Sequence, residues 1–327
     1  MKIASFFSGA GGLDLGFINA GFEVAFANDN WKGCWESFEK NHKLQICKKS
    51  ITEIDESEIP DVVGFVGGPP CQSWSLAGAM RGIDDSRGKL FYNYINLIEK
   101  KKPLFFLAEN VAGILSPKHN PEFMKIVDAF KKIGYNVSYK LLDAKNYGVP
   151  QERKRVIVVG YHKKIAKAFE FPEPNRKFVT IKGAIGDLPE PVPANFGKQL
   201  TIPNHEYMVG GFSTIYMSRN RVRSWDEQSF TIQAGARHAP IHPQANKMIL
   251  ISENKRAFDK NSPKPYRRLS VRECARIQTF PDDFIFHYKS ISDGYKMIGN
   301  AVPVKLAEVI ANKIMQDLKE AKINNKI

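Results

Sequence analysis

The stretch KIASFFSGAGGLDLGFINAGFEVAFAND, residues 2–29, decides the fold class of this chain. It opens with an apolar run at residues 3–7, which predicts a strand, and continues into a glycine-rich turn at residues 8–12. A helix is expected to begin near Leu13, and a second strand at residues 23–27. Strand, glycine turn, helix and strand in this order are typical of the opening unit of a doubly wound α/β sheet.

The same stretch predicts a ligand site. Glycines allow backbone N–H groups to approach a ligand closely at the N-terminus of a helix. Asp29 follows the second strand at the distance where a carboxylate binds ribose hydroxyls. The pattern indicates a cofactor that contains adenosine. It fits a nicotinamide dinucleotide and S-adenosylmethionine equally, and a plain tight turn is the simpler alternative.

Short apolar runs continue to alternate with helical patterns as far as about Phe169, which is typical of an α/β sheet. Further strands are expected at residues 62–66, 104–108, 137–142 and 156–160. Helices are expected between them, at residues 91–100 and 122–133.

The later part of the chain has a different character. Residues 171–265 are rich in Pro, Gly, Asn and Ser, so we expect a smaller, irregular, mostly β domain there. Helices return at residues 271–277 and 304–318, and the last one carries an apolar stripe that needs a core to cover. We therefore expect a catalytic and cofactor-binding domain at residues 1–170, an inserted domain at 171–265, and a return segment at 266–327 that completes the first domain.

The composition restricts the class of protein. Lys and Arg number 48 against 34 Asp and Glu, which favours a polyanionic partner, although a solvated basic surface explains the excess almost as well. The four cysteines lie far apart with no C-x-x-C spacing, so neither a metal site nor a disulfide framework is expected. No signal-peptide core or run of transmembrane length occurs, and we expect a cytoplasmic protein with no membrane partner.

The segment GGPPCQSWS, residues 67–75, directly follows the strand expected at residues 62–66. Ligands of doubly wound sheets bind at the carboxyl ends of strands, which is where this spacing puts Cys71. Pro69 and Pro70 stiffen the turn, so the thiol would stand on a rigid support. A single cysteine is more often a small buried apolar residue, but this position favours a nucleophile.

Three more side chains are expected at the same edge of the sheet. Glu109 ends the strand expected at residues 104–108. The two later strands read as a hairpin whose loop closes with QERKR, residues 151–155. If the first strand of that hairpin runs parallel to the sheet, Arg153 and Arg155 return to this edge. Each residue alone fits a solvated charge, but together with Cys71 they predict an active site.

On these residues the chain resembles the bacterial DNA cytosine-5 methyltransferases over essentially its whole length, in particular the GGCC-modifying HaeIII type. Six motifs occur in the order typical of that family. They are FxGxGG at residues 7–12, PCQ at 70–72, ENV at 109–111, QxRxR at 151–155, RxLxxRECARxQxFPD at 267–282 and GNAVP at 299–303.

The resemblance implies that a methyl group passes from S-adenosylmethionine to carbon 5 of a cytosine in double-stranded DNA. The thiolate of Cys71 would add to carbon 6, which makes carbon 5 electron-rich enough to take the methyl group. Glu109 would bind the ring at N3 and the exocyclic amine, Arg155 the cytosine carbonyl, and Arg153 the nearby backbone. The target base must be flipped out of the duplex, and residues 76–90 are the expected loop that closes over it.

The family's cofactor positions also fall on this chain. They are Phe7, Ala10, Gly11, Gly12, Asp29, Ser50, Ile51, Pro69, Leu90, Asn300 and Val302. Two positions depart from the family's pattern. Ser50 stands where many members have Asp for the adenine amino group, so its hydroxyl would make a weaker contact. Asn30 stands where an aromatic residue often stacks on the adenine, with Trp31 one place later.

Arginines alternate in SRNRVRSW, residues 218–225, which on a strand would project all three from one face. Arginine is the commonest reader of guanine in the major groove, through bonds to O6 and N7, although at least one of the three is expected on phosphate. With PNHEY at residues 203–207, this segment resembles the recognition domain of the GGCC-modifying enzymes. The expected DNA contacts are Gln72, Ser75, Arg219, Arg221, Arg223, Arg237 and His238.

Three alternatives remain open. An RNA cytosine-5 methyltransferase would have a similar fold, and the sizeable recognition domain argues against it. A catalytically silent DNA-binding protein would not need intact Cys71 and Glu109, and a nicotinamide oxidoreductase has no role for either segment around them. We expect double-stranded DNA as the partner and a monomeric enzyme at the bacterial nucleoid. A cognate restriction endonuclease is expected as a functional partner, unless the enzyme is an orphan methyltransferase.

Overall fold

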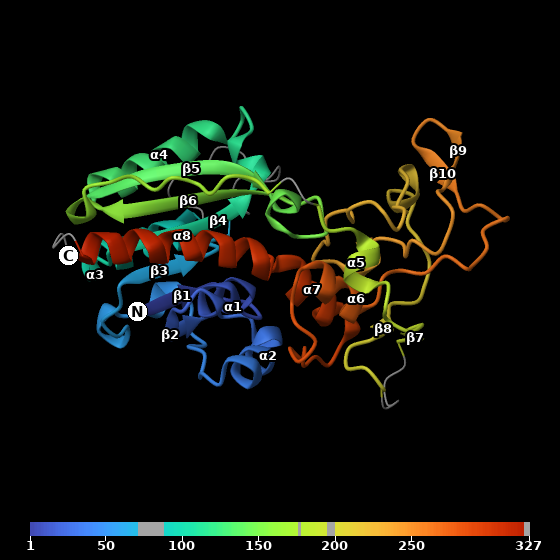
Figure 1. Cartoon of the computed structure of the whole chain (residues 1–327), viewed down its shortest axis with the longest axis horizontal. Coiled ribbons are helices and arrows are strands. Elements are labelled where there is room, and N and C mark those ends of the chain that lie inside the picture. The colour runs from blue at the N-terminus through green and yellow to red at the C-terminus, as the bar shows by residue number, and fades with distance from the viewer. Residues whose placement is uncertain (71–87, 176–177, 195–199, 324–327) are drawn as a thin grey trace. The chain divides into compact units, whose positions relative to one another are not determined.

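A six-stranded sheet with the strand order β2-β1-β3-β4-β6-β5 forms the centre of the first part of the chain (Figure 1). The computed structural model describes residues 1–70, 88–175, 178–194 and 200–323. The strands β2, β1, β3 and β4 are parallel neighbours, and β6 runs antiparallel to both β4 and β5. Their bounds are β1 (Lys2–Phe6), β2 (Glu23–Asn28), β3 (Gly64–Gly67), β4 (Phe105–Val111), β5 (Tyr135–Asp143) and β6 (Lys154–His162). All six predicted strands are thus confirmed, and so is the doubly wound α/β fold.

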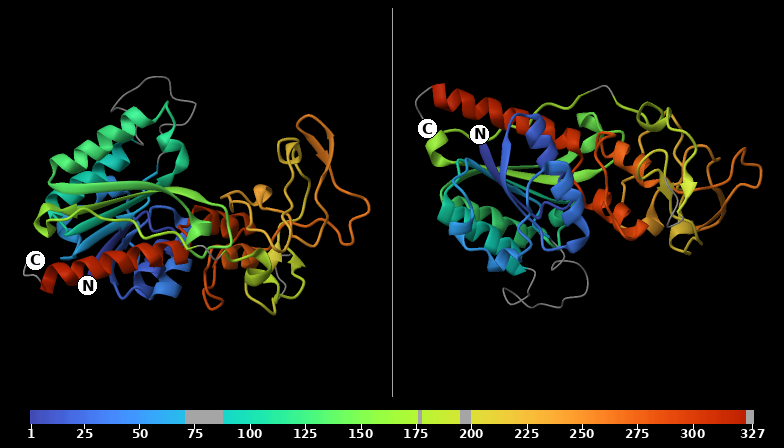
Figure 2. Two further views of the ribbon diagram at one scale, coloured as in Figure 1. Left: turned by 45° about the horizontal axis from the view of Figure 1, so that its top comes forward. Right: turned by 90° about the horizontal axis from the view of Figure 1, so that it is seen from below.

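Helices cover both faces of this sheet. Their bounds are α1 (Gly12–Asn19), α2 (Lys32–His42), α3 (Gly88–Lys101), α4 (Asn120–Lys132) and α8 (Val304–Ile323). Residues of α3 and α4 pack against one face, while Phe17 of α1 stacks on Phe105 from the other face. Figure 2 shows the sheet between these two layers. The helices predicted at residues 91–100 and 122–133 are confirmed, whereas α2 was not predicted.

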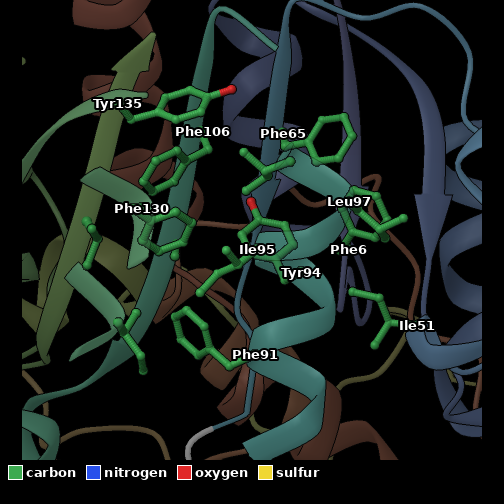
Figure 3. Close-up of a cluster of buried hydrophobic side chains, with 14 of the residues drawn as sticks. Phe6, Ile51, Phe65, Phe91, Tyr94, Ile95, Leu97, Phe106, Phe130 and Tyr135 are labelled. Carbon is green, nitrogen blue, oxygen red and sulfur yellow. The ribbon is translucent and has the colours of Figure 1, made fainter. Parts of the chain in front are cut away.

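The main core lies between the sheet and the helices α3 and α4 (Figure 3). Phe6, Phe65 and Phe106 come from three neighbouring strands and are fully buried. Phe106 stacks on Phe130 of α4 with ring centroids 3.9 Å apart, and Tyr94 of α3 meets Phe6 edge to face at 5.6 Å. Burying side chains of this size contributes roughly 1.5–3 kcal/mol each, so this cluster fixes the sheet that carries the site.

The C-terminal helix behaves as its apolar stripe predicts. The stripe is buried throughout, at Leu306, Ala307, Ile310, Ala311, Ile314 and Leu318. Tyr161 of β6 donates a hydrogen bond to Asp317 of this helix, with 2.8 Å between Oη and Oδ2. From Leu306 onward the helix therefore belongs to the first part of the chain, as expected.

The chain divides into two compact units. Unit 1 comprises residues 1–143, 154–173 and 306–327, and unit 2 comprises residues 144–153 and 174–305. Residues 144–153, expected in the first domain, belong to unit 2, whose longer segment begins at Pro174. Residues 266–305 differ from expectation, because they belong to unit 2 and not to the catalytic domain. Hydrogen bonds explain this difference. The buried Arg272 donates to the carbonyls of Pro203 and Phe284, which ties this stretch to the backbone of unit 2.

Unit 2 is largely irregular. Its helices and strands are α5 (Ile181–Ile185), α6 (Val271–Ile277), α7 (Ile291–Asn300), β7 (Val192–Pro193), β8 (Glu206–Tyr207), β9 (Ile249–Ser252) and β10 (Lys255–Ala257). The predicted helix at residues 271–277 is confirmed, and α7 was not predicted. No helix in the described ranges is long and apolar enough to cross a membrane.

Candidate active site

Two of the predicted catalytic residues meet at the carboxyl edge of the sheet. Glu109 stands near the end of β4, and Arg155 stands at the start of β6, opposite Val111. The Nε of Arg155 lies 2.8 Å from the Oε1 of Glu109, and both side chains are largely buried, 14% and 12% exposed. Because β6 runs antiparallel to β4, its first residues return to the edge where β4 ends. The expected hairpin geometry is therefore what joins the pair.

The turn after β3 lies against this pair. A Cβ on Gly68 would stand 3.3 Å from the Oε2 of Glu109, so the backbone passes close beside the carboxylate. Asn110 holds the next residue, since its Nδ2 donates to the carbonyl of Pro69 at 3.0 Å. Cys71, Gln72, Ser75 and most of the expected closing loop, residues 76–87, lie outside the described residues. The structure therefore defines the support that leads to Cys71, with Asn110 as a residue that holds it.

Arg153 contacts main-chain carbonyls and not Glu109. It belongs to unit 2, is 1% exposed, and donates to the carbonyls of Ile232 at 2.9 Å, Gly299 at 2.8 Å and Ala301 at 3.0 Å. A buried guanidinium engaged with three carbonyls holds the main chain in place. Arg153 was grouped with the catalytic residues and expected to bind nearby backbone. Its contacts with backbone carbonyls make it a positioning residue, while Arg155 makes the contact with Glu109.

The glycine turn after β1 adopts the strained backbone that its sequence predicts. Phe7, Gly9 and Gly11 all have positive φ, at 54°, 57° and 90°. Asp29 fastens the turn: its Oδ2 accepts from the N–H of Gly9 at 2.9 Å, and its Oδ1 accepts from the N–H of Trp31 at 2.8 Å. A carboxylate oxygen has two lone pairs, so each oxygen is able to accept a ribose hydroxyl as well. The turn fits an adenosine-containing cofactor.

His42 supports the same turn and was missed by the sequence analysis. Its Nε2 lies 3.3 Å from the carbonyl oxygen of Ala10, and its ring stacks on Phe38. Burial lowers the pKa of His42 to about 4, so the ring is neutral at physiological pH. Since a carbonyl only accepts, Nε2 carries the hydrogen. A side chain on Gly11 would collide with this ring, so the glycine is required for packing as well as for its φ.

The remaining predicted cofactor residues are spread over both units. In unit 1, Ile51 and Pro69 are buried and Leu90 packs against the main core. The hydroxyl of Ser50 accepts from the N–H of Thr52 and caps a short 3₁₀ helix (Ile51–Glu53). In unit 2, Asn300 is exposed and Val302 is buried.

The two residues at the expected adenine-stacking position differ in exposure. Asn30 is exposed. The ring of Trp31 lies close over Gly33, in the first turn of α2.

The alternating arginines do not lie on a strand, which corrects that prediction. Val222 forms only an isolated bridge, to Ile241. Arg223 is committed to ion pairs with Glu152 at 2.6 Å and Glu227 at 2.9 Å, and its guanidinium lies over the ring of Phe230. Arg223 is thus a structural residue of unit 2.

The other predicted DNA contacts remain available to different degrees. Arg221 is half-buried and donates to the carbonyls of Tyr216 at 2.9 Å and Ile215 at 3.2 Å. Arg219, Arg237 and His238 are exposed. Exposed guanidinium groups are the ones able to reach base edges or phosphates.

Comparison with known families identifies the class. The profile described as "C-5 cytosine-specific DNA methylase" matches residues 1–316. The chain therefore belongs to this family. It is a DNA cytosine-5 methyltransferase, and its cofactor is S-adenosylmethionine. This finding removes the alternatives of a nicotinamide oxidoreductase and of a catalytically silent protein.

Several individual proteins are similar over nearly their whole length. The type II methyltransferase M.MthTI of Methanothermobacter thermautotrophicus is 68% identical, with 97% of this chain and 98% of that protein covered. M.FnuDI of Fusobacterium nucleatum is 51% identical, with 97% and 95% covered, and M.NgoPII of Neisseria gonorrhoeae is 48% identical, with 97% and 96% covered.

Solved structures support the fold. A DNA modification methyltransferase encoded within an E. coli prophage aligns with a TM-score of 0.74 at 23% identity and covers 98% of this chain and 99% of its own. The Entamoeba histolytica methyltransferase EhMeth aligns with a TM-score of 0.71 at 17% identity, with 97% and 98% covered.

Proposed function

We propose that this enzyme methylates a cytosine within GGCC in duplex DNA, with Cys71 as its nucleophile. The observation that carries the catalytic part is the 2.8 Å pair between Glu109 and Arg155 beside Gly68, three residues before Cys71. Glu109 and Arg155, beside the turn that leads to Cys71, supply the hydrogen-bond donors and acceptor that a cytosine ring needs.

In the proposed reaction the Cys71 thiolate adds to carbon 6 of a flipped-out cytosine and forms a carbon–sulfur bond. When bound, S-adenosylmethionine would supply an electrophilic methyl group to carbon 5, with its sulfur–methyl bond broken and a neutral thioether as the leaving group. The proton on carbon 5 then leaves to a base, and the returning electrons expel the thiolate. Glu109 in its protonated form donates to N3 and accepts from the exocyclic amine, and Arg155 donates to the ring carbonyl, so that both stabilise the charge that develops as the thiolate adds.

We assign the cofactor to two groups of residues. In unit 1 the glycine turn, Asp29 and the residues after β2 and β3 would hold the adenosine and the methionine portion. The proposed contacts are Phe7, Ala10, Gly11, Gly12, Asp29, Ser50, Ile51, Pro69 and Leu90. Unit 2 would add Asn300 and Val302. Because the Ser50 hydroxyl already caps a 3₁₀ helix, we expect it to contribute little to adenine binding.

The proposed target sequence rests on the resemblance of residues 203–207 and 218–225 to GGCC-type recognition domains, and on the exposed Arg219 and Arg237. Gln72, Ser75, Arg221 and His238 are proposed as further DNA contacts. The relatives are named type II methyltransferases, so we also propose a cognate restriction endonuclease that cleaves the same site, and a monomeric enzyme acting in the cytoplasm.

Methylation mapped on a random-sequence duplex library at fixed salt tests the target. The wild type should give a map centred on GGCC. Arg219→Ala should relax discrimination at one guanine by roughly 1–3 kcal/mol, as loss of a bidentate base contact does. Arg223→Met serves as the matched control, since that guanidinium is engaged inside unit 2, and it should leave the map unchanged. A wild-type map centred on another site, such as GCGC, would refute GGCC and leave the methyltransferase activity intact.

A further inference from the structure

The backbone around Asn300 is held by side chains from distant parts of unit 2. Asn300 is the last residue of α7, where the final carbonyls of a helix lack partners within the helix. Nε2 of Gln278 donates to the carbonyls of Ile298 at 2.8 Å and Ala301 at 3.2 Å. Arg153 donates to those of Gly299 and Ala301. Gln278 and Arg153 are buried, 0% and 1% exposed, so water does not compete for these bonds.

The amide of Gln278 is itself fixed from the other side. Its Oε1 accepts from Nε2 of Gln151 at 2.8 Å, and Oε1 of Gln151 accepts from the N–H of Ile232 at 2.8 Å. Because the carbonyls of Ile298 and Ala301 only accept, Nε2 of Gln278 must face them, which sets the orientation of both amides. Each of the four amide nitrogen and oxygen atoms of this buried pair therefore has a hydrogen-bond partner, and a buried network of this kind rigidifies what it touches.

The same part of the chain also holds the residues that follow. The carbonyl of Gln278 accepts from the N–H of Val304 at 3.1 Å, and Oγ1 of Thr279 accepts from the N–H of Lys305 at 2.9 Å. Thr279 adopts a positive φ of 62° to do so. Hydrogen bonds therefore hold the segment from Ile298 to Lys305 at both ends.

Within this gripped segment Asn300 is exposed and Gly299 packs directly against other backbone. A Cβ on Gly299 would collide with the main chain of Gln233 and Ala234, so no side chain fits there. The main chain is locked, and the one polar side chain of the turn projects outward. Such an arrangement fixes the backbone that carries the amide, so that binding would have to order only the Asn300 side chain.

We propose that Gln278 is a positioning residue for cofactor binding: it holds the turn at Asn300 in its binding geometry without touching the cofactor. The proposal rests on the proposed assignment of Asn300 and Val302 as cofactor contacts. Gln278 acts through the carbonyls of Ile298 and Ala301, with Gln151 fixing its orientation and Arg153 completing the grip.

The test uses the full-length enzyme with Gln278→Met, which keeps the length of the side chain and removes its hydrogen bonds. We expect S-adenosylmethionine to bind about tenfold more weakly by titration calorimetry, with KM raised alike and kcat at saturating cofactor within about threefold. Affinity for a GGCC duplex should stay within about twofold. Gln278→Glu should fail to restore cofactor affinity, because it keeps the acceptor for Gln151 and loses the donor to the turn.

Gln244→Met is the matched control. Gln244 lies in the same unit and donates to the carbonyl of Pro265 at 2.9 Å, away from the turn, so its loss should leave cofactor affinity unchanged. Asn300→Ala separates the two layers of the proposal. If it binds the cofactor normally, the assignment of Asn300 is wrong. If it weakens binding and Gln278→Met does not, the positioning role is wrong.

A general structural role makes a different pattern. It would lower cofactor and DNA affinity together in Gln278→Met, which overturns the proposal. Should Gln278→Met fail to fold, Gln151→Met breaks the same amide pair from its other end and should raise KM for the cofactor by about threefold. Failure of both variants to fold would show that the pair serves folding alone, and would also overturn the proposal.

Discussion

The two units differ most in the long polar side chains that they bury. Unit 1 has an aromatic core in which Phe6, Phe65 and Phe106 lie between a regular sheet and its helices. Unit 2 also buries apolar side chains. They include the cluster of Tyr216, Val222, Ile241, Ala245 and Met248 and the packed rings of Phe280, Phe284 and Phe286. In addition, unit 2 buries charged and amide side chains, namely Gln151, Arg153, Arg267, Arg268, Arg272, Glu273 and Gln278.

The difference follows from the backbone. In a sheet or a helix the main chain satisfies its own hydrogen bonds, so the interior needs only apolar volume. An irregular backbone leaves carbonyls without partners, and buried polar groups must be paired. Arg268 supplies such partners, since it donates to the carbonyls of Gly210 at 3.1 Å and Gly211 at 2.8 Å while its guanidinium lies over the ring of Phe212. In unit 2, arginine and glutamine side chains therefore donate hydrogen bonds to backbone carbonyls that regular secondary structure would otherwise satisfy.

The largest effect should come from removing the catalytic carboxylate of unit 1. We expect Glu109→Ala to lower kcat by roughly 10²–10⁴-fold, the range typical of a positioned acid or base, because the cytosine ring loses its partner at N3. Single-turnover methylation measures this directly. Glu122→Ala is the control, since Glu122 forms a surface pair with Lys125 and is 45% exposed. An equal loss in both variants, or none in Glu109→Ala, would contradict the assignment.

The second prediction compares the two interiors. Phe106→Ala should destabilise unit 1 by about 3–5 kcal/mol through the cavity it leaves. Glu273→Ala should destabilise unit 2 by about 3 kcal/mol, because the buried guanidinium of Arg267 loses its buried partner at 2.9 Å and keeps only the exposed Glu190 at 2.7 Å. Hydrogen exchange resolved by peptide reads each unit separately.

The apolar replacement of that pair sharpens the comparison. Arg267→Met combined with Glu273→Leu should be milder than Glu273→Ala alone, since no uncompensated charge remains. If the double variant is the more damaged, the pair has a role in unit 2 beyond neutralising charge.

These contrasts also explain how far the sequence could predict the molecule. Short apolar runs predicted all six strands of the sheet, and a helical apolar pattern predicted the buried stripe from Leu306 to Leu318, because buried positions recur regularly in such elements. The carboxyl edge followed from topology, which is why Glu109 and Arg155 were correctly brought together. Hydrogen bonds between residues far apart in sequence, such as Gln151 with Gln278, leave no periodic signal.

Two site residues show the same limit. Arg153 and Arg155 are two positions apart, and both were expected at the carboxyl edge of the sheet. The structure instead has Arg153 facing the carbonyls around Asn300 and Arg155 paired with Glu109. His42 lies at the end of α2, far along the chain from the glycine turn that it supports, and only the folding of the chain through α1, β2 and α2 places it beside Ala10. Alternation of Arg219, Arg221 and Arg223 predicted a strand, but ion pairs and ring contacts set their orientations instead.

The smallest of these effects concerns Asp14, a buried carboxyl in the first turn of α1. Burial raises the pKa of Asp14 to about 7, and the charge of Asp29 adds to the shift. The folded pKa lies above the ordinary value of 3.8, so the stability this group contributes is complete below pH 3.8 and is lost as the pH rises through 7. Asp14→Asn removes that dependence.

Relative to the wild type, Asp14→Asn should therefore gain roughly 2–3 kcal/mol in the free energy of unfolding of unit 1 between pH 5 and pH 8. Urea unfolding, read by exchange of the β1 and α1 amides, measures the difference. The control is Asp128→Asn, whose carboxylate is 58% exposed, and it should show no such slope. A pH-independent difference for Asp14→Asn would mean that the buried carboxyl stays charged.

The central claim is that unit 1 performs the chemistry through Cys71 at a cytosine of GGCC. The most direct measurement is covalent trapping on a duplex that carries 5-fluorocytosine in that site, in the presence of S-adenosylmethionine. Fluorine does not leave carbon 5 as a proton does, so the adduct persists through denaturing electrophoresis. The wild type and Cys47→Ser should form the adduct, and Cys71→Ser should form none. An adduct of normal yield with Cys71→Ser would contradict the account.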